Sequence, residues 1–343
     1  DELLEALNAR DRVISALEQR VAALEHERAA TVSPAPGPAA APSPATAAAP
    51  PSAQTSAGDD EAQLQALSRA LVQRGGLLLP AWRAEFVPSL AYANREVQGL
   101  ALAQTPEGIP TVADQRLRND QLHATAALRV GLPWASQVEV RVPYAWQHQS
   151  RSLGDGASTV NDGSGLGDVE LALSHQFLRE KGWRPDLLGA FSWRAPTGRD
   201  PFDAPVAAVA AGSGTHELRA RITALKTTDP LVFFGALSYA RDLAANKSFG
   251  LYQPGDALGV ELGSILALNP ETSLTLGLSQ EFRGRTQIDH TARPGTDTAA
   301  ASLQLGFDRV LTSRVLLDVS LGVGLTRDAP DYVLQMSLPI RFR

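Results

Sequence analysis

The chain has 343 residues, a net charge of −6 and no cysteine. This length accommodates one large domain with extensions. The missing cysteines exclude a disulfide framework, thiol catalysis and thiolate metal sites. The mild acidity, without a basic block or basic helix face, argues against nucleic-acid binding. No stretch approaches the ~20 consecutive apolar residues of a membrane-spanning helix.

The chain begins Asp-Glu-Leu-Leu without an initiator Met, and we interpret it as a mature form that has lost a signal peptide. Residues 1–29 show a heptad pattern that predicts a coiled-coil oligomerisation helix. One polar residue, Arg10, falls within the seam. The expected seam residues are Leu3, Leu7, Ile14, Leu17, Val21 and Leu24. The alternative is an amphipathic helix docked on another part of the protein.

Residues 30–58 consist almost entirely of Ala, Pro, Ser, Thr and Gly. Such a segment has too few large apolar groups to offset its conformational entropy, and repeated prolines extend it. We therefore expect a disordered linker that acts as a tether, with a proline-rich ligand for a partner as the alternative.

Residues 59–76 are expected to form a second helix. Asp59 and Asp60 can cap its N-terminus, and Gly75 and Gly76 end it. Leu64, Leu67 and Leu71 form a stripe on one side, while Arg69 and Arg74 lie elsewhere on the helix. Its place between the linker and the first strand makes it a candidate plug. The alternative is a helix that covers the mouth of the barrel or docks on a partner.

From about residue 80 the hydrophobic period changes to two, and we assign residues 77–343 to the barrel. Apolar residues alternate with polar ones from Leu122 to Leu132, from Val138 to Trp146, and from Val315 to Leu325. Segments of ~10 residues with this alternation are typical of strands in outer-membrane barrels, which in bacteria have an even strand number. Counting between turns predicts an antiparallel transmembrane β-barrel of about twelve strands.

The connections between these segments alternate in length. Those at residues 133–136, 227–230, 269–271 and 311–313 are short, whereas residues 98–118, 150–166, 196–214, 242–255 and 284–297 are long and polar. Short turns at one end and long loops at the other are typical of outer-membrane barrels. A soluble sandwich has a different pattern of connections.

In each strand, the positions that alternate with the apolar residues face the lumen of a barrel. Many of these inward positions are charged. They are Glu85, Arg129, Glu139, Arg141, Glu170, Arg194, Arg219, Arg221, Glu261, Glu281, Arg283 and Asp318. A soluble protein does not easily bury so many charges. We expect a wet, polar channel whose charges set selectivity, or alternatively a solvated inner wall that only holds the barrel open.

The sequence marks no catalytic or metal-binding constellation. No two of the six histidines have metal-ligand spacing on one element. The glycine-rich run from Gly163 to Asp168 lacks the Lys-Ser/Thr of a P-loop and precedes a strand. We therefore predict no enzyme activity, no metal and no cofactor.

Four short motifs occur in order along the barrel. The first is Gly167-Asp168 before Val169, and the second is Pro196-Thr197-Gly198 between Ala195 and Phe202. The third is Asp229-Pro230 after Leu225-Lys226, and the fourth is Asp328-Ala329-Pro330-Asp331. With the coiled coil, linker and helix upstream, they resemble the outer-membrane secretion channel for functional amyloid (the FapF type). That channel lies within a broader group of barrels associated with phenol degradation.

The resemblance implies a homotrimer joined by the coiled coil, with a lumen blocked by the helix before strand one. It implies a gated channel that exports unfolded amyloid subunits from the periplasm to the cell surface for the biofilm matrix. The implied partners are outer-membrane lipids, the amyloid subunits and periplasmic secretion proteins, and the N-terminal stalk would be periplasmic. Two alternatives remain open: a diffusion channel for small hydrophobic or aromatic compounds, and a non-conducting structural tether.

Overall fold

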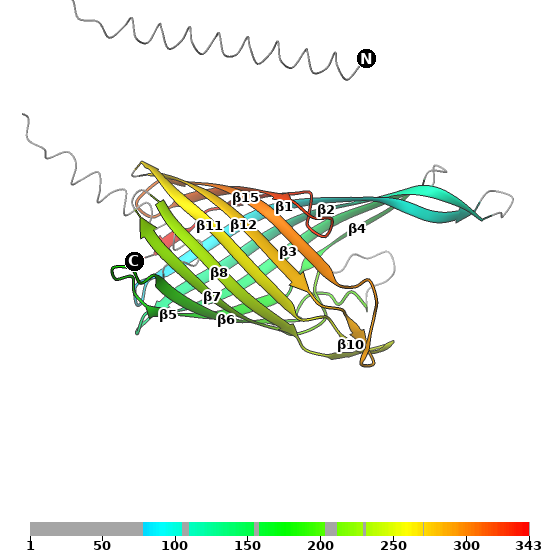
Figure 1. The fold of residues 1–343 in the computed structure, drawn as a ribbon, viewed down its shortest axis with the longest axis horizontal. Coiled ribbons are helices and arrows are strands. Elements are labelled where there is room, and N and C mark those ends of the chain that lie inside the picture. The colour runs from blue at the N-terminus through cyan, green and yellow to red at the C-terminus, as the bar shows by residue number, and fades with distance from the viewer. Residues whose placement is uncertain are drawn as a thin grey trace, which may run out of the picture. The chain divides into compact units, whose positions relative to one another are not determined.

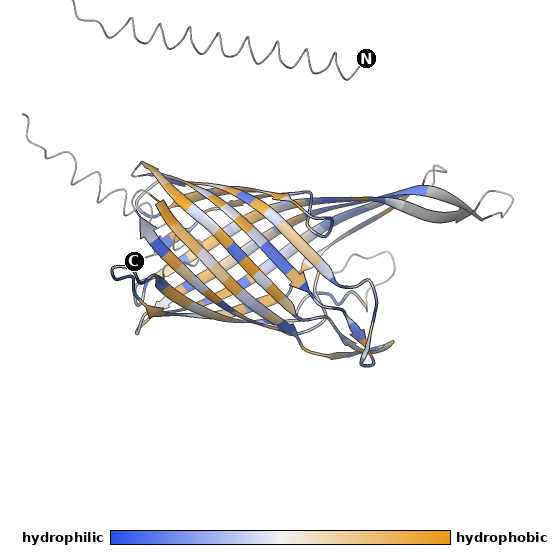
Figure 2. Ribbon diagram, in the orientation of Figure 1, coloured by the Kyte–Doolittle hydropathy of each residue, from blue (hydrophilic) through white to orange (hydrophobic). Residues whose placement is uncertain are grey.

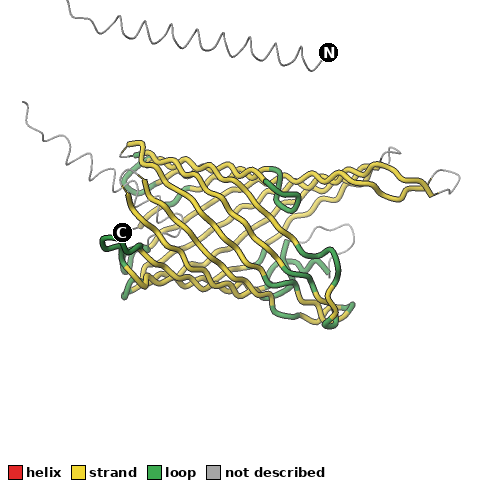
Figure 3. The backbone as a smooth tube through the Cα atoms, viewed as in Figure 1, coloured by secondary structure: helices red, strands yellow, loops and turns green. Residues whose placement is uncertain are grey.

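The computed structural model describes residues 78–104, 110–153, 158–202, 211–228, 231–269 and 271–342. The predicted coiled coil, linker and plug helix lie outside these residues, as does the motif pair Asp229-Pro230. All regular structure within the described ranges is β-strand, drawn yellow in Figure 3. No helix long and apolar enough to cross a membrane occurs there.

The main sheet contains fourteen strands. They are β1 (Ala84–Gln104), β2 (Pro110–Leu132), β3 (Ser136–Leu153), β4 (Ser158–Leu166), β5 (Val169–Leu178), β6 (Asp186–Ala195), β7 (Glu217–Thr228), β8 (Leu231–Asp242), β11 (Ala257–Asn269), β12 (Thr272–Arg283), β15 (Thr298–Val310), β16 (Leu316–Gly324), β17 (Tyr332–Ser337) and β18 (Ile340–Phe342). A separate four-stranded sheet contains β9 (Ala245–Lys247), β10 (Gly250–Gln253), β13 (Gln287–Ile288) and β14 (Thr291–Ala292).

The main sheet closes into a barrel because its first strand pairs with its last ones (Figure 1). β1 pairs antiparallel with β17 through Ser89↔Ser337 and with β18 through Glu85↔Arg341. β17 and β18 are successive segments of one crossing, and so are β4 and β5, which both pair with β3. The wall therefore has twelve positions, which confirms the predicted strand number. Closure removes every sheet edge from the wall, as a lipid environment requires.

Each crossing presents large apolar side chains outward, and Figure 2 shows the apolar residues distributed along the barrel strands. On β8, Phe233, Leu237 and Tyr239 are 49%, 53% and 47% exposed, whereas their neighbours Val232 and Ala236 are buried. Successive side chains on a strand point to opposite faces, so the exposed set faces outward and the buried set faces the lumen. The predicted alternation is confirmed.

The short turns are where the sequence predicts them, but two predicted long loops are wrong. β1 and β2 pair from Ala84↔Val130 to Gln104↔Pro110, so most of residues 98–118 form a long hairpin. It protrudes from one end of the barrel in Figure 1. Likewise, β3 and β4 occupy most of residues 150–166. Both faces of a strand that extends beyond the membrane can be polar. Such a strand lacks the alternation of apolar and polar residues that marks a membrane strand, so the sequence predicts a loop there.

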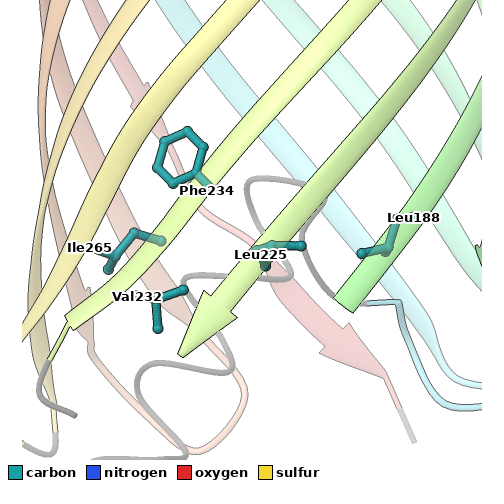
Figure 4. Close-up of a cluster of buried hydrophobic side chains, with 5 residues drawn as sticks. All are labelled: Leu188, Leu225, Val232, Phe234 and Ile265. Atoms are coloured by element: carbon teal, nitrogen blue, oxygen red, sulfur yellow. The ribbon is translucent and has the colours of Figure 1, made fainter. Parts of the chain in front are cut away.

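Near the short-turn end, one patch of the inner wall is apolar rather than charged. Five residues of β6, β7, β8 and β11 pack together there (Figure 4). They are Leu188, Leu225, Val232, Phe234 and Ile265, each no more than 8% exposed. Leu78, which precedes the first strand, packs against this cluster. The chain therefore contacts the inner wall at this end before it joins the barrel as β1.

Candidate functional site

The lumen is the candidate site, and its inner wall carries two networks of ion pairs. The first follows β18, β1, β2, β3 and β5 and alternates base and acid in the order Arg341, Glu85, Arg129, Glu139, Arg141 and Glu170. Glu85 is 1% exposed and accepts from Arg341 Nε at 2.8 Å and from Arg129 Nη1 at 3.3 Å. Because the lumen side of these strands is tightly paired, this part of the wall is less open to water than the sequence suggested.

The second network joins β6, β7, β8 and β12. Its members are Arg194, Glu217, Arg219, Asp242, Glu281 and Arg283. Arg219 Nη1 lies 3.2 Å from Glu281 Oε2, although β8 and β11 separate their strands. Arg283 Nη1 donates to Asp242 Oδ2 at 2.7 Å. These contacts extend over several strands along the inner face.

The structure brings together all but one of the predicted lumen charges in ion pairs. Arg221 Nη2 pairs with Glu261 Oε2 at 2.6 Å. The exception is Asp318, whose carboxylate accepts a hydrogen bond from Ser337 Oγ at 3.4 Å. Sequence reasoning missed Glu217, Asp242 and Arg341. Glu217 lies just after a predicted loop and Asp242 lies at the first position of another, while Arg341 meets Glu85 only through barrel closure.

Asp168, from the first family motif, fastens the loop between β6 and β7 to the wall. Its carboxylate accepts hydrogen bonds from the backbone N of Gly198 at 3.0 Å and from the backbone N and Oγ of Ser213 at 2.8 and 2.6 Å. Thr197 Oγ1 accepts from Val169 N at 2.9 Å. The motif residues Gly167, Asp168, Thr197 and Gly198 thus meet at the junction between β4 and β5, where they position a loop.

The fourth motif is the loop between β16 and β17, which folds toward the lumen. Gly324 has the inward parity, and a Cβ on it would stand 2.1 Å from the Pro330 carbonyl oxygen. Asp328 Oδ2 accepts from Ala299 N at 2.7 Å, and Asp331 Oδ2 accepts from Glu96 N at 2.7 Å. The two motif carboxylates therefore hold the loop against β15 on one side and β1 on the other.

Two long loops meet at the end opposite the short turns, the β6–β7 loop and the β8–β11 connection that contains β9 and β10. Rings of Phe202, Phe249 and Tyr252 pack edge to face, with centroid separations of 4.9 Å for Phe202–Phe249 and 4.7 Å for Phe202–Tyr252. Lys247 pairs with Asp200 and donates to the Gly214 carbonyl oxygen at 2.7 Å. These contacts join the β6–β7 loop to the hairpin of β9 and β10.

Burial alone would raise the pKa of Asp200, but the hydrogen bonds from Lys247 and from Phe202 N outweigh it and hold that pKa below its usual value. Within the described ranges, no group of three His, Cys, Asp or Glu residues could hold a metal ion. Two histidines contact aromatic rings. His175 packs against Phe177 at 5.0 Å and His216 stacks on Trp193 at 5.8 Å, measured between centroids.

The barrel has clear relatives among known structures. An outer membrane channel from Pseudomonas putida F1 superimposes with a TM-score of 0.60 at 19% identity, covering 78% of this chain and 97% of that one. The translocator domain of the autotransporter NalP from Neisseria meningitidis gives a TM-score of 0.42 at 14% identity, covering 83% and 98%. The CymD monoaromatic hydrocarbon channel gives 0.39 at 11% identity, covering 77% and 90%.

The first of these similarities shows the fold, and the other two are too distant to carry an argument. A family model described as putative MetA-pathway of phenol degradation matches residues 112–342, from β2 to the end of the barrel. This match favours the diffusion channel over amyloid export, which none of these comparisons supports. The chain belongs to this family, putative MetA-pathway of phenol degradation.

Proposed function

We propose that the chain is an outer-membrane channel for passive diffusion of small hydrophobic and aromatic compounds. The observation that carries the proposal is the closed twelve-position barrel in a family described by phenol degradation. The wall is apolar outside and polar inside, as a channel in lipid requires. By the usual arrangement of such barrels, the short turns face the periplasm and the long loops face the outside.

The charges of the lumen suit uncharged solutes. Arginines and carboxylates alternate along both networks and neutralise one another in pairs. Such a wall does not present the single-sign field that attracts ions of one charge. The planar guanidinium groups can stack on aromatic rings, which adds a favourable contact for these solutes.

A second part of the proposal concerns gating by the segment before β1. Leu78 packs on the apolar patch of the inner wall, and Leu79 N donates to Gln137 Oε1 at 3.0 Å. Gly131 has the inward parity, and a Cβ on it would lie 2.1 Å from the Pro80 carbonyl oxygen. These contacts bring the chain to the inner wall at the periplasmic end. In the proposal, residues 59–76 continue from there and narrow the opening, with Leu64, Leu67 and Leu71 on the apolar patch.

Reconstituted membranes test the transport function. The vesicles carry lipopolysaccharide in the outer leaflet, because a membrane of this kind slows the entry of apolar solutes. They contain either the folded full chain or heat-denatured protein. We expect radiolabelled toluene and phenol to enter vesicles with the folded chain several-fold faster. Equal rates would contradict the proposal.

Planar bilayers test the gate separately. A variant that lacks residues 1–77 should conduct more than the full chain if the segment before β1 narrows the opening. Equal conductance would exclude this gate while leaving diffusion through the barrel intact. A barrel that conducts in neither form would instead favour the structural tether.

A further inference from the structure

A recess lies in the inner wall, in the half of the lumen near the long loops. Its volume is about 320 Å³, and its lining comes from β7, β8, β11, β12 and β15. Ala329 and Pro330 of the inward-folded β16–β17 loop also line it. We call this space the lumen recess. A cavity of ~150 Å³ is enough for benzene, and small-molecule pockets begin at ~300 Å³, so the recess suits one substituted ring.

The floor of the recess is flat because small residues form it. Ala236, Gly259 and Ala300 line it on three different strands. A Cβ on Gly259 would stand 2.5 Å from Ser238 Oγ, so it would displace that hydroxyl. A planar ring can therefore lie close to the backbone of the wall. A branched or bulky molecule gains less contact with the same floor.

Hydroxyl and charged groups surround this floor. Ser279 and Ser302 hydrogen-bond to each other at 2.8 Å, and Ser238 lines the recess beside them. Arg221 and Arg219 also line it, paired with Glu261 at 2.6 Å and with Glu281 at 3.2 Å. Hydroxyl groups both donate and accept, so the serines match a hydroxyl substituent on a ring.

The paired charges decide which rings fit. A carboxylate on the solute would meet Glu261 and Glu281 as well as the two arginines, so it gains little and loses its hydration. A neutral hydroxyl can donate to a glutamate or accept from an arginine without that cost. A guanidinium can also stack on the ring face.

We infer that the lumen recess is a binding site for a neutral hydroxylated monoaromatic compound on its way through the channel. This inference rests on the proposed function and names the site and the class of solute. The binding is weak, because conduction requires a solute to leave the site as readily as it enters. The β16–β17 loop forms one side of the site, so this loop contributes to selectivity.

Fluorine NMR of 4-fluorophenol with the full chain in lipid nanodiscs tests the inference. Ala300→Leu fills the recess, and Ala172→Leu is the matched control, because Ala172 lies on β5 beside Glu139 and outside the recess. We expect wild type and control to broaden the 4-fluorophenol line equally, with a several-fold loss for Ala300→Leu. Partition into lipid is the same in all samples and therefore cancels.

Equal broadening by wild type and Ala300→Leu would overturn the inference. Heat-modifiable gel mobility shows whether Ala300→Leu folds. If it does not, Ser302→Leu fills the same recess, and the same loss of 4-fluorophenol broadening is expected. The site also predicts less broadening for 4-fluorobenzoate and 4-fluorotoluene than for 4-fluorophenol, and the reverse order would contradict it. Transport without binding refutes the site alone, whereas binding without transport refutes the proposed function.

Discussion

Two arcs of the inner wall differ in how their side chains use the lumen. On β18, β1, β2, β3 and β5, long charged side chains pair in a continuous row. On β8, β11, β12 and β15, glycine, alanine and serine lie among the Arg221–Glu261 and Arg219–Glu281 ion pairs and leave the lumen recess. Ion pairs follow one another without interruption on the first arc, whereas small residues of the second arc leave a recess. The position of the solute path thus follows from residue size as much as from charge.

The largest effect should come from breaking the charged row at its most buried carboxylate. Glu85→Gln leaves the guanidinium groups of Arg129 and Arg341 without their shared carboxylate, which is 1% exposed. Breaking a buried pair costs about 3–5 kcal/mol, and we expect a loss of that order. Urea unfolding in lipid vesicles measures it.

Glu96→Gln is the matched control, because the Glu96–Arg116 pair is much more exposed. An exposed pair contributes about 0–1 kcal/mol, so this change should be close to neutral. Equal losses in the two variants would show that the buried row has no special role in holding the first arc together.

A smaller effect is expected where Asp168 ties the β6–β7 loop to the wall. Asp168→Ala leaves three donors without their carboxylate, two backbone N–H groups and the Ser213 hydroxyl. Each buried unsatisfied group costs about 1–3 kcal/mol, although water can reach a freed loop and reduce this cost. The measurable result is faster proteolytic cleavage between residues 196 and 216. Unchanged cleavage would mean that other contacts hold the loop.

The charged side of this contrast could largely be predicted from the sequence. Counting segments between turns predicted the twelve crossings. Strand parity placed charges such as Arg129 and Glu139 on the inner face, because a period of two assigns a face directly. Parity could also have found Asp308, which is buried on the inner face of β15. One of the two partners of Glu85 could not be found in this way. Arg341 lies 256 residues away and is adjacent only in the closed barrel.

The loops show more clearly what could not be predicted from the sequence. The motif from Asp328 to Asp331 was recognised, but its residues do not indicate that the loop turns into the lumen. That direction depends on the missing side chain at Gly324, whose meaning appears only when the Pro330 carbonyl oxygen is seen beside it. The lumen recess was unpredictable for the same reason, since it is formed by small residues on four strands, by two arginines of β7 and by this loop.

Gly324→Ala tests whether the β16–β17 loop narrows the lumen beside the second arc. The new Cβ would stand 2.1 Å from the Pro330 carbonyl oxygen, so the loop must move away. We expect a cost of about 1–3 kcal/mol and a higher single-channel conductance. Gly322→Ala is the control, because its Cβ would meet Val333 at an ordinary 3.7 Å. A conductance change in the control alone would contradict this role of the loop.

The smallest effect concerns pH at the outer loops. The pKa of Asp200 lies below its usual value. Burial raises this pKa, but the hydrogen bonds from Lys247 and from Phe202 N lower it by more than burial raises it. The stabilising contact is therefore complete above the unfolded pKa of about 4 and is lost as the pH falls through the lower folded value. Cleavage of the β6–β7 loop should rise at about pH 3 relative to about pH 5. Asp200→Asn should remove this dependence.

The most direct test of the central claim is uptake by cells. A Gram-negative strain that degrades aromatic compounds in its cytoplasm, and lacks its own channel of this kind, receives the full chain or the Ala300→Leu variant at equal folded levels. With phenol at limiting concentration, the wild-type chain should raise the uptake rate several-fold, and Ala300→Leu should return it toward the rate without the channel. Uptake unchanged by the wild-type chain would contradict the account.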